Sequence, residues 1–431
     1  MKIIRVNSIH RQRLLVDTGE QDRIMGEEPT LHHLLKTWKR QTRRPIKQIY
    51  DDNGTLQTLS MSIMKVFSTW FHAKFQPIQI DERSVSQLSD CGIQTVTPEM
   101  NAALKEPISL EELRHATTQG KAYKAPGHDG TCLEFFRTAW DVLKLDLLQI
   151  MNHMYIEGRT TARQLQELIV CLPKNAHPKN VDDYRPLVFL NTDYKTLTRL
   201  TANRLRPCLA AILHPNQHCG IQGNSAFEAV ATVRQAVAHA EVTTTPLCIV
   251  SIDFSAALDK ISHFYLLAIV HAHGFTDWFL QRIMGMYSKA AMEVQINGFR
   301  SNLMPIHSSI RQGCPLSTQL FALCLNPLIQ TLERRLKGIQ IGRGHAKMAV
   351  IAYADDVTIF LTSPVDVRKL QETLLIYEAA TGAKVNMRKS RALALGTWDT
   401  TTQIMDIPYH TDVKIMGLHF TNKVNTSANE I

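Results

Sequence analysis

The chain has 431 residues, and 44% of them are hydrophobic, which is ample for two or three packed units and excludes a disordered tail. The formal net charge of +9 suits a polyanionic partner, and residues 1–50 hold 11 Lys and Arg against 5 Asp and Glu. No segment has the length of a membrane span or the apolar run of a signal peptide, and the eight cysteines form no CxxC pair, so we expect reduced thiols in the nucleus or cytoplasm.

Residues 1–104 are predicted to form a basic, mainly helical N-terminal extension. Between Leu31 and Tyr50, six basic residues meet no acidic neighbour and form a candidate nucleic-acid contact: Lys36, Lys39, Arg40, Arg43, Arg44 and Lys47. The alternative is a solvated helix face. After a turn signal at Asp51–Gly54, Met61–Phe75 carries apolar residues at helical spacing.

Residues 105–167 are predicted to be a second helical region. A short helix with an acidic first turn is expected at Leu110–Thr117, followed by the loop KAPGHDG at residues 124–130 and a helical stretch from Cys132 to Ile156. The next expected elements are a strand at Glu167–Leu172 and helices at Tyr194–Leu213 and Ala226–Ala240. Beyond Pro246 apolar strands alternate with helices, which indicates an α/β or α+β fold, and we assign α+β.

Acidic residues follow two apolar runs in the C-terminal half. The predicted buried strand Leu247–Ile252 ends in Asp253, and the run Met348–Tyr353 meets Asp355 and Asp356 before a further apolar segment. The second pattern predicts a hairpin with two acids at its tip, although Asp is also an ordinary turn former. If the strands are neighbours, the three acids converge and can hold two Mg2+ ions about 4 Å apart, the arrangement that catalyses phosphoryl transfer. Hard oxygen ligands favour Mg2+, with Mn2+ as a substitute.

The segment Ser309–Ser317, SIRQGCPLS, lies between these acids. Gly313 allows close approach of backbone to a ligand, and Pro315 suits the first turn of a helix. Alone, the segment is typical of a loop-to-helix junction, but its position between the carboxylates favours a role in the site. A zinc site at Cys208, His214, His218 and Cys219 is disfavoured because their spacing matches no standard ligand pattern.

Ordered sequence blocks resemble those of LINE-type, non-LTR retrotransposon reverse transcriptases over roughly residues 105–420. Besides KAPGHDG, the blocks are LPK (172–174), DDYRPL (182–187), NTDYKTLTRLTANRL (191–205), HPNQ (214–217), RQGCPLS (311–317), AYADD (352–356), TGAKVNMRKS (381–390) and MGLHF (416–420). The resemblance implies a right-hand polymerase with fingers at residues 168–245 and a palm at 246–431. Against the family pattern we expect this chain to be a fragment or decayed copy that lacks the endonuclease and the thumb.

The implied activity is RNA-directed DNA polymerisation, with an RNA template, a DNA primer and dNTPs as partners. The resemblance assigns metal binding and catalysis to Asp253, Asp355 and Asp356. It assigns nucleotide binding to Lys174, Arg185, Phe254, Leu258, Gln312, Gly313 and Lys389. It assigns primer or template contacts to Arg311, Met416 and Gly417. A guanidinium such as that of Arg185 suits charge-assisted, bidentate contact with a triphosphate, although surface salt bridges are the alternative for Lys174 and Arg185.

Two positions depart from the family pattern. The family usually has Ala-Phe-Asp where this chain has Ala257-Leu258-Asp259, and the missing ring predicts weaker exclusion of the ribose 2′-hydroxyl. Gly-Arg is usual where this chain has Gly223-Asn224. A catalytically inactive, nucleic-acid-binding remnant is therefore an alternative function. An RNA-directed RNA polymerase is a weaker alternative, because such enzymes more often have Gly at the position of Ala354.

Overall fold

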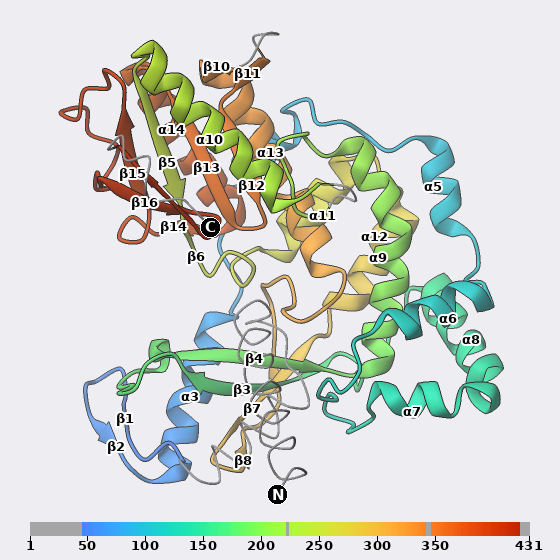
Figure 1. Cartoon of the computed structure of the whole chain (residues 1–431). Coiled ribbons are helices and arrows are strands. Elements are labelled where there is room, and N and C mark those ends of the chain that lie inside the picture. Colours follow the sequence, from blue (N-terminus) through green and yellow to red (C-terminus); the bar gives the residue numbers. More distant parts are fainter. Residues whose placement is uncertain (1–44, 221–223, 342–345, 423–431) are drawn as a thin grey trace, which may run out of the picture.

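Two β-sheets joined by helices make up the protein, which we describe from a computed structural model covering residues 45–220, 224–341 and 346–422 (Figure 1). The mixture of helices and antiparallel strands confirms the α+β assignment. Of the six basic residues predicted to contact nucleic acid, only Lys47 is among the described residues, and it is exposed. The other five lie outside them. Among the described helices, none combines the length and apolarity needed to cross a membrane.

The first sheet has four antiparallel strands with β5 and β13 at its centre. Their order is β12 (Val350–Tyr353), β13 (Asp356–Leu361), β5 (Leu247–Ile252) and β15 (Arg391–Leu395). Side chains of β5 alternate between two cores, because successive residues of a strand point to opposite faces. Leu247 and Ile249 pack with α10 (Ala226–Thr243) on one face. Cys248, Val250 and Ile252 face the main core on the other, which α13 (Ser317–Arg335) and α14 (Pro364–Thr381) cover.

The second sheet has five strands drawn from two distant parts of the chain. Its order is β4 (Tyr184–Leu190), β3 (Gln166–Pro173), β7 (Ala291–Ile296) and β8 (Phe299–Arg300), and β9 (Met304–Pro305) also pairs with β7. The β3–β7 pairing is parallel. Strand β7 follows residue 246 in the chain but belongs to this second sheet, whereas α10 precedes residue 245 but covers the first sheet. The predicted boundary between fingers and palm at residues 245–246 therefore does not separate the residues of one sheet from those of the other.

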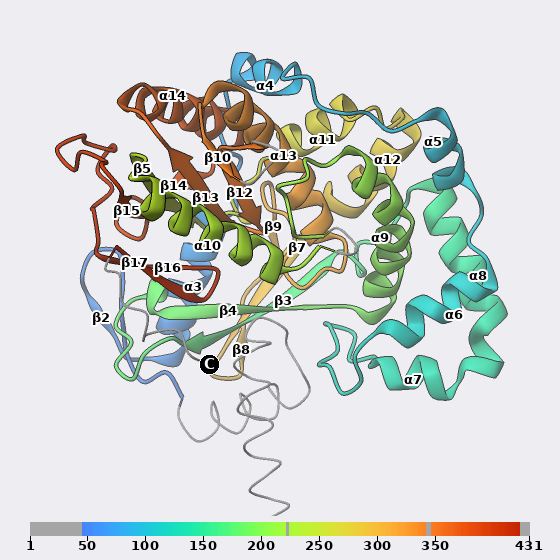
Figure 2. The same ribbon diagram turned by 45° about the horizontal axis from the view of Figure 1, so that its top comes forward.

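Helices fill the space beside the two sheets (Figure 2). The remaining helices are α3 (Ser60–Lys74), α4 (Glu82–Ser89), α5 (Pro98–Lys105), α6 (Leu110–Gln119), α7 (Leu133–Thr138), α8 (Trp140–Glu157), η1 (Val181–Asp183), α9 (Thr192–Ile212), α11 (His263–Ala272) and α12 (Asp277–Tyr287). The stretch predicted as one helix from Cys132 to Ile156 is divided between α7 and α8 at Ala139, whose backbone leaves the helical conformation.

Four two-stranded pairings complete the described part of the fold. They are β1 (Ile49–Tyr50) with β2 (Leu56–Gln57), β6 (Phe254–Ser255) with β14 (Lys384–Val385), β10 (Ile339–Ile341) with β11 (Ala346–Met348), and β16 (Asp412–Ile415) with β17 (Leu418–Thr421). The β6–β14 pairing directly follows the end of β5. It therefore brings the segment after α14 to the same end of the first sheet as Asp253.

The segment from residue 45 to residue 105 packs against the second sheet and against helices that cover the first. Helix α3 lies against β7 and β8, whereas α4 lies against α14. Apolar residues of α3 at helical spacing, Ile63, Phe67 and Phe71, are fully buried in the main core. This N-terminal segment is therefore part of the same packed body as the sheets, as Figure 2 also shows.

Candidate active site

Three aspartates lie at one end of the four-stranded sheet. Asp253 directly follows β5 and Asp356 begins β13. Antiparallel pairing places Ile252 opposite Val357, so the next register position brings Asp253 opposite Asp356. Asp355 occupies the two-residue turn between β12 and β13, where Ala354 has a φ of +54°. The predicted hairpin and the adjacency of the two strands are thus confirmed, and the carboxyl end of β5 is directed toward the layer that contains β3 and β4 (Figure 1).

The electrostatic environment disfavours negative charge at this end of the sheet. Burial raises the pKa of Asp356 to about 6, and the neighbouring charges of Asp355 and Asp253 add to that rise. Burial also raises the pKa of Asp253, and the charge of Lys389 is the largest influence acting against that rise. Since close carboxylates without a counter-ion repel one another, the arrangement favours a divalent cation. Within the three described ranges, no three His, Cys, Asp or Glu side chains are gathered closely enough to enclose a metal ion by themselves.

The turn that precedes β15 fixes the backbone of Asp253. The amide of Asn386 donates to the Asp253 carbonyl oxygen at 2.7 Å, and the amide of Asp253 donates to the Ser390 hydroxyl at 3.1 Å. Lys389 lies exposed in the same turn, and its positive charge partly offsets the rise in the pKa of Asp253 that burial causes. The predicted nucleotide-binding residue Lys389 is therefore adjacent to the carboxylates.

A further segment extends the sheet beyond β12. Gln217 pairs in parallel with Ala352, whose amide donates to the Asn216 carbonyl at 2.9 Å and whose carbonyl accepts from the His218 amide at 2.9 Å. The HPNQ block thus supports the strand that leads into the turn carrying Asp355. Its sequence signal was visible, but its pairing with β12 was not predicted.

The RQG segment, Arg311–Gly313, lies against β3 and β4 of the second sheet and against the residues that follow β6. The Gln312 amide nitrogen donates to Asp259 at 3.0 Å, and the carbonyl of Leu258 accepts from the Ile310 amide at 2.8 Å. Gly313 has a φ of +71°, and a Cβ there would lie only 3.3 Å from the Val188 carbonyl oxygen of β4. A side chain at this position would therefore be strained by both backbone conformation and lack of space.

Two predicted contact residues face the interior. Arg311, expected to touch primer or template, is 1% exposed, pairs with Glu167 and stacks 4.3 Å from the centre of the Tyr194 ring. Its guanidinium therefore cannot reach nucleic acid without leaving a buried ion pair, which corrects that prediction. The Phe254 ring is likewise buried, 5.6 Å from that of Tyr377, so only its backbone is available for a nucleotide.

Other predicted residues lie at the ends of hairpins. Exposed Lys174 follows β3, and its ammonium group donates to the Asp182 carbonyl at 2.7 Å. Arg185 is also exposed and lies on β4 opposite Leu172. Met416 and Gly417 form the two-residue turn between β16 and β17, both with positive φ, as tight hairpin turns require.

The remaining predicted residues have intermediate exposure. Leu258 packs at the edge of the main core. Asn224, one of the two departures from the family pattern, makes a hydrogen bond of 3.5 Å to the Gln217 carbonyl. This contact ties Asn224 to the segment that extends the sheet.

Comparison with known proteins identifies the family. Residues 173–420 match the model of the reverse transcriptase (RNA-dependent DNA polymerase) family. The chain is 30% identical to a Xenopus laevis protein, the transposon TX1 uncharacterized 149 kDa protein, over 83% of this chain and 27% of that protein. It is 23% identical to the Pol polyprotein of the Drosophila melanogaster type-2 retrotransposable element R2DM, over 82% of this chain and 32% of that protein.

A third relative is the RNA-directed DNA polymerase from mobile element jockey of Drosophila funebris. It is 24% identical over 78% of this chain and 36% of that protein. The chain thus spans roughly a third of the length of these curated relatives. Since the family match covers more than half of the chain and encloses all three carboxylates, the chain belongs to the reverse transcriptase (RNA-dependent DNA polymerase) family, with relatives in non-LTR mobile elements as its sequence blocks implied.

Proposed function

We propose that this chain is the RNA-directed DNA polymerase core of a non-LTR retrotransposon protein. The carrying observation is the placement of Asp253, Asp355 and Asp356 at one end of neighbouring strands, where burial and the charge of Asp355 raise the pKa of both Asp253 and Asp356. An RNA template, a DNA primer and dNTPs are the proposed partners, and the nucleus or cytoplasm is the proposed location.

The arrangement of the sheets supports a right-hand polymerase. In this proposal the four-stranded sheet is the palm, and β3 and β4 form the core of the fingers. The carboxyl end of β5 is directed toward the fingers layer (Figure 1). A primer terminus at the carboxylates would therefore meet a nucleotide held from the side of β3 and β4.

The three aspartates are the proposed ligands of two Mg2+ ions, for which Mn2+ can substitute. Their hard oxygen donors suit these ions. The ions would neutralise the negative charges of the aspartates and so remove their mutual repulsion. When bound, the ions lower the pKa of the primer 3′-hydroxyl and neutralise charge on the reacting phosphate and the leaving pyrophosphate. Lys389, next to Asp253, is suited to hold pyrophosphate as it departs.

Nucleotide recognition is assigned to both sides of the site. Lys174 and Arg185 would hold the triphosphate from the fingers, while Gln312 and Gly313 would border the new base pair. The backbone of Phe254 and the side chain of Leu258 would lie near the sugar. At the other hairpin, Met416 and Gly417 would support the primer. Arg311 is left out of these contacts because it is buried.

Primer extension tests the proposal. Purified chain is incubated with poly(rA) primed by oligo(dT), labelled dTTP and Mg2+ or Mn2+, with the Asp355→Asn variant as control. We expect extension by the wild type and none by the variant. Equal signals from both proteins would point to a contaminating polymerase, and no extension by the wild type under any metal condition would reject catalysis by this chain.

The alternative of an inactive nucleic-acid-binding remnant draws on the two departures, Leu258 and Asn224. It predicts no extension but binding of primed RNA that weakens steeply as salt rises, because phosphate contacts release counter-ions. Filter binding at two salt concentrations, run beside the extension assay, separates the two functions.

A further inference from the structure

We infer that Lys74, at the end of α3, is a positioning residue that orients the Gln312 side chain through Asp259. The juxtaposition joins three parts of the chain: the N-terminal helix α3, the Ala-Leu-Asp segment and the RQG segment. The inference rests on the proposed function, in which Gln312 borders the new base pair. Lys74 itself lies outside the family match at residues 173–420.

The ammonium group of Lys74 is held away from bulk water. Its Nζ lies 2.6 Å from Asp259 Oδ2, and the two side chains are 13% and 6% exposed. The rings of Trp70 and Phe75 lie 5.0 Å and 5.7 Å from the same atom, within the range of a cation–π contact. These rings limit the directions in which the lysine can move, so its charge is fixed next to Asp259.

The Asp259 carboxylate divides its oxygen atoms between two partners. Oδ2 accepts from Lys74, and Oδ1 accepts from Gln312 Nε2 at 3.0 Å. An ionised carboxylate only accepts hydrogen bonds, so it engages the NH2 end of the glutamine amide and leaves the carbonyl oxygen pointing elsewhere. Lys74 holds this carboxylate in place, and the carboxylate determines which end of the Gln312 amide is free for a nucleotide or template base.

Backbone contacts make the three parts one unit. The amides of His307, Ser309 and Ile310 donate to the carbonyls of Phe75, Ile261 and Leu258, at 3.0, 2.9 and 2.8 Å. The side chain of Lys260 also donates to the Lys74 carbonyl at 3.0 Å. A change at Lys74 is therefore transmitted over short, direct contacts to the segment that carries Gln312.

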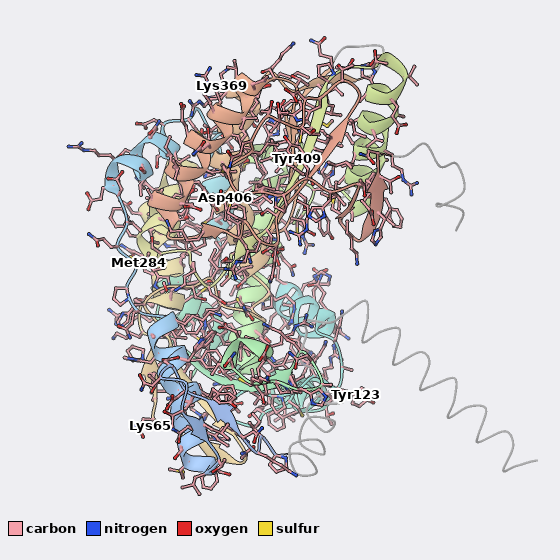
Figure 3. All side chains as sticks on the ribbon, turned by 90° about the vertical axis from the view of Figure 1, so that its left-hand side faces the viewer. Lys65, Tyr123, Met284, Lys369, Asp406 and Tyr409 are labelled. Carbon is pink, nitrogen blue, oxygen red and sulfur yellow. The ribbon has the colours of Figure 1, made fainter. Side chains whose placement is uncertain are left out.

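Steady-state primer extension tests the catalytic consequence. We expect Lys74→Met to raise the KM for dTTP about tenfold while kcat changes less than about threefold, because ground-state orientation of the nucleotide is lost. Lys74→Arg, which keeps the cation, should restore most of the affinity. The matched control is Lys65→Met, which removes the same charge from an exposed position of α3 whose side chain points outward (Figure 3).

Two Asp259 variants separate orientation from folding. Asn at position 259 retains an oxygen that can accept from Gln312, whereas Leu has none. We therefore expect Asp259→Asn to raise the KM less than Asp259→Leu. If Lys74→Met does not fold, as judged by circular dichroism, this pair of variants still tests the inference. Equal effects of Asn and Leu at position 259 would reject it.

Hydrogen exchange gives a readout that needs no activity. In Lys74→Met the amides of residues 306–313 should exchange at least about fivefold faster than in the wild type and in Lys65→Met, because their anchor is weakened. Unchanged exchange in Lys74→Met, together with an unchanged KM, overturns the inference. Failure of the wild type to extend a primer would reject the proposed function, but the exchange result would still decide whether Lys74 controls the Gln312 segment.

Discussion

Two regions of this protein hold carboxylates whose pKa is raised by desolvation, and they compensate the charge in different ways. Glu167, on β3, is buried against Arg311, whose guanidinium also bonds the Leu165 carbonyl and stacks on Tyr194. At the end of the four-stranded sheet, Asp253 and Asp356 lie opposite each other with Asp355 beside them, and burial is the largest cause of the raised pKa of Asp253 and of Asp356.

The difference indicates which charges serve the fold and which serve a ligand. Where the chain supplies its own cation, as at Glu167, removing that cation leaves a buried charge unpaired and costs stability. Where like charges face one another, removing one relieves repulsion but takes away a ligand for a cation that arrives from outside. The two regions should therefore respond oppositely to charge-removing substitutions.

The largest expected effect is loss of polymerisation in Asp356→Asn. We expect activity to fall at least about 10⁴-fold, equivalent to about 5.5 kcal/mol, because a proposed metal ligand is lost. The free energy of unfolding should stay the same or rise, since the amide removes like-charge repulsion. Primer extension and urea unfolding of metal-free protein measure the two quantities. The control is Asp406→Asn, which removes the same charge from an exposed side chain; Asp406 is labelled in Figure 3. A strongly destabilised, still active Asp356→Asn would contradict the comparison.

Arg311→Met should lower the stability of the protein, whereas Asp356→Asn should not. It leaves Glu167 buried without its cation, so we expect the free energy of unfolding to fall by about 3–5 kcal/mol. The control Arg300→Met breaks a half-exposed pair with Glu293, for which a loss below about 1 kcal/mol is expected. Urea unfolding measures both variants. If Arg311→Met is as stable as its control, the buried pair contributes little and the proposed contrast is wrong.

A buried histidine extends the comparison to pH. His273 is fully buried between the Ile269 carbonyl and the Asn326 side chain, and burial lowers its pKa to about 4. Because the unfolded chain binds this proton at its ordinary pKa near 6.5, the stability contributed by neutral His273 is present above about pH 6.5. It is lost as the pH falls from about 6.5 toward 4, by up to about 3 kcal/mol.

Melting temperatures between pH 7 and 4 test this sign. His273→Gln should show a shallower loss of melting temperature with acid than the wild type, whatever its stability at pH 7. His271→Gln, at an exposed position of the same helix, is the matched control. Parallel curves for His273→Gln and the wild type would mean that His273 does not couple protons to folding.

The sequence was informative where hydrophobic pattern and chemistry coincide. A continuous apolar run before Asp253 predicted a strand buried on both faces, and the two acids after Tyr353 predicted a hairpin tip. Both forecasts depend on local pattern alone. The resulting site also required β5 and β13 to be neighbours, which the ordered family blocks implied and spacing alone left open.

Contacts between residues far apart in the chain could not be predicted from local sequence pattern. Arginine is usually exposed, and nothing near Arg311 signals that Glu167, 144 residues away, neutralises it. Helical periodicity in α3 identified its apolar face but not the sheet that covers it, so the contact of Lys74 with Asp259 could not be foreseen. The parallel pairing of β7 with β3 was missed for the same reason.

Leu258→Phe tests recognition of the nucleotide sugar, whereas the preceding substitutions test the compensation of buried or facing charges. A ring at this position should block the ribose 2′-hydroxyl, so we expect the preference for dTTP over UTP to rise by about tenfold, equivalent to about 1.4 kcal/mol. The ratio of kcat/KM for the two nucleotides on primed poly(rA) measures it. The half-buried Leu258 side chain packs on the main core, so melting must be checked in parallel. Equal rejection of UTP by wild type and variant would remove Leu258 from the sugar contact.

The smallest expected effect concerns two turns with the same backbone geometry. Met416-Gly417 and Asn297-Gly298 are both two-residue hairpin turns with positive φ, and a Cβ at either glycine meets nothing within 4 Å. Gly417→Ala and Gly298→Ala should therefore cost a similar amount of stability, about 1 kcal/mol each, from backbone strain alone. Only Gly417→Ala should also weaken binding of a primed template, because only its turn is proposed to support the primer. Equal binding by the two variants in filter assays would leave the β16–β17 turn with a purely structural role.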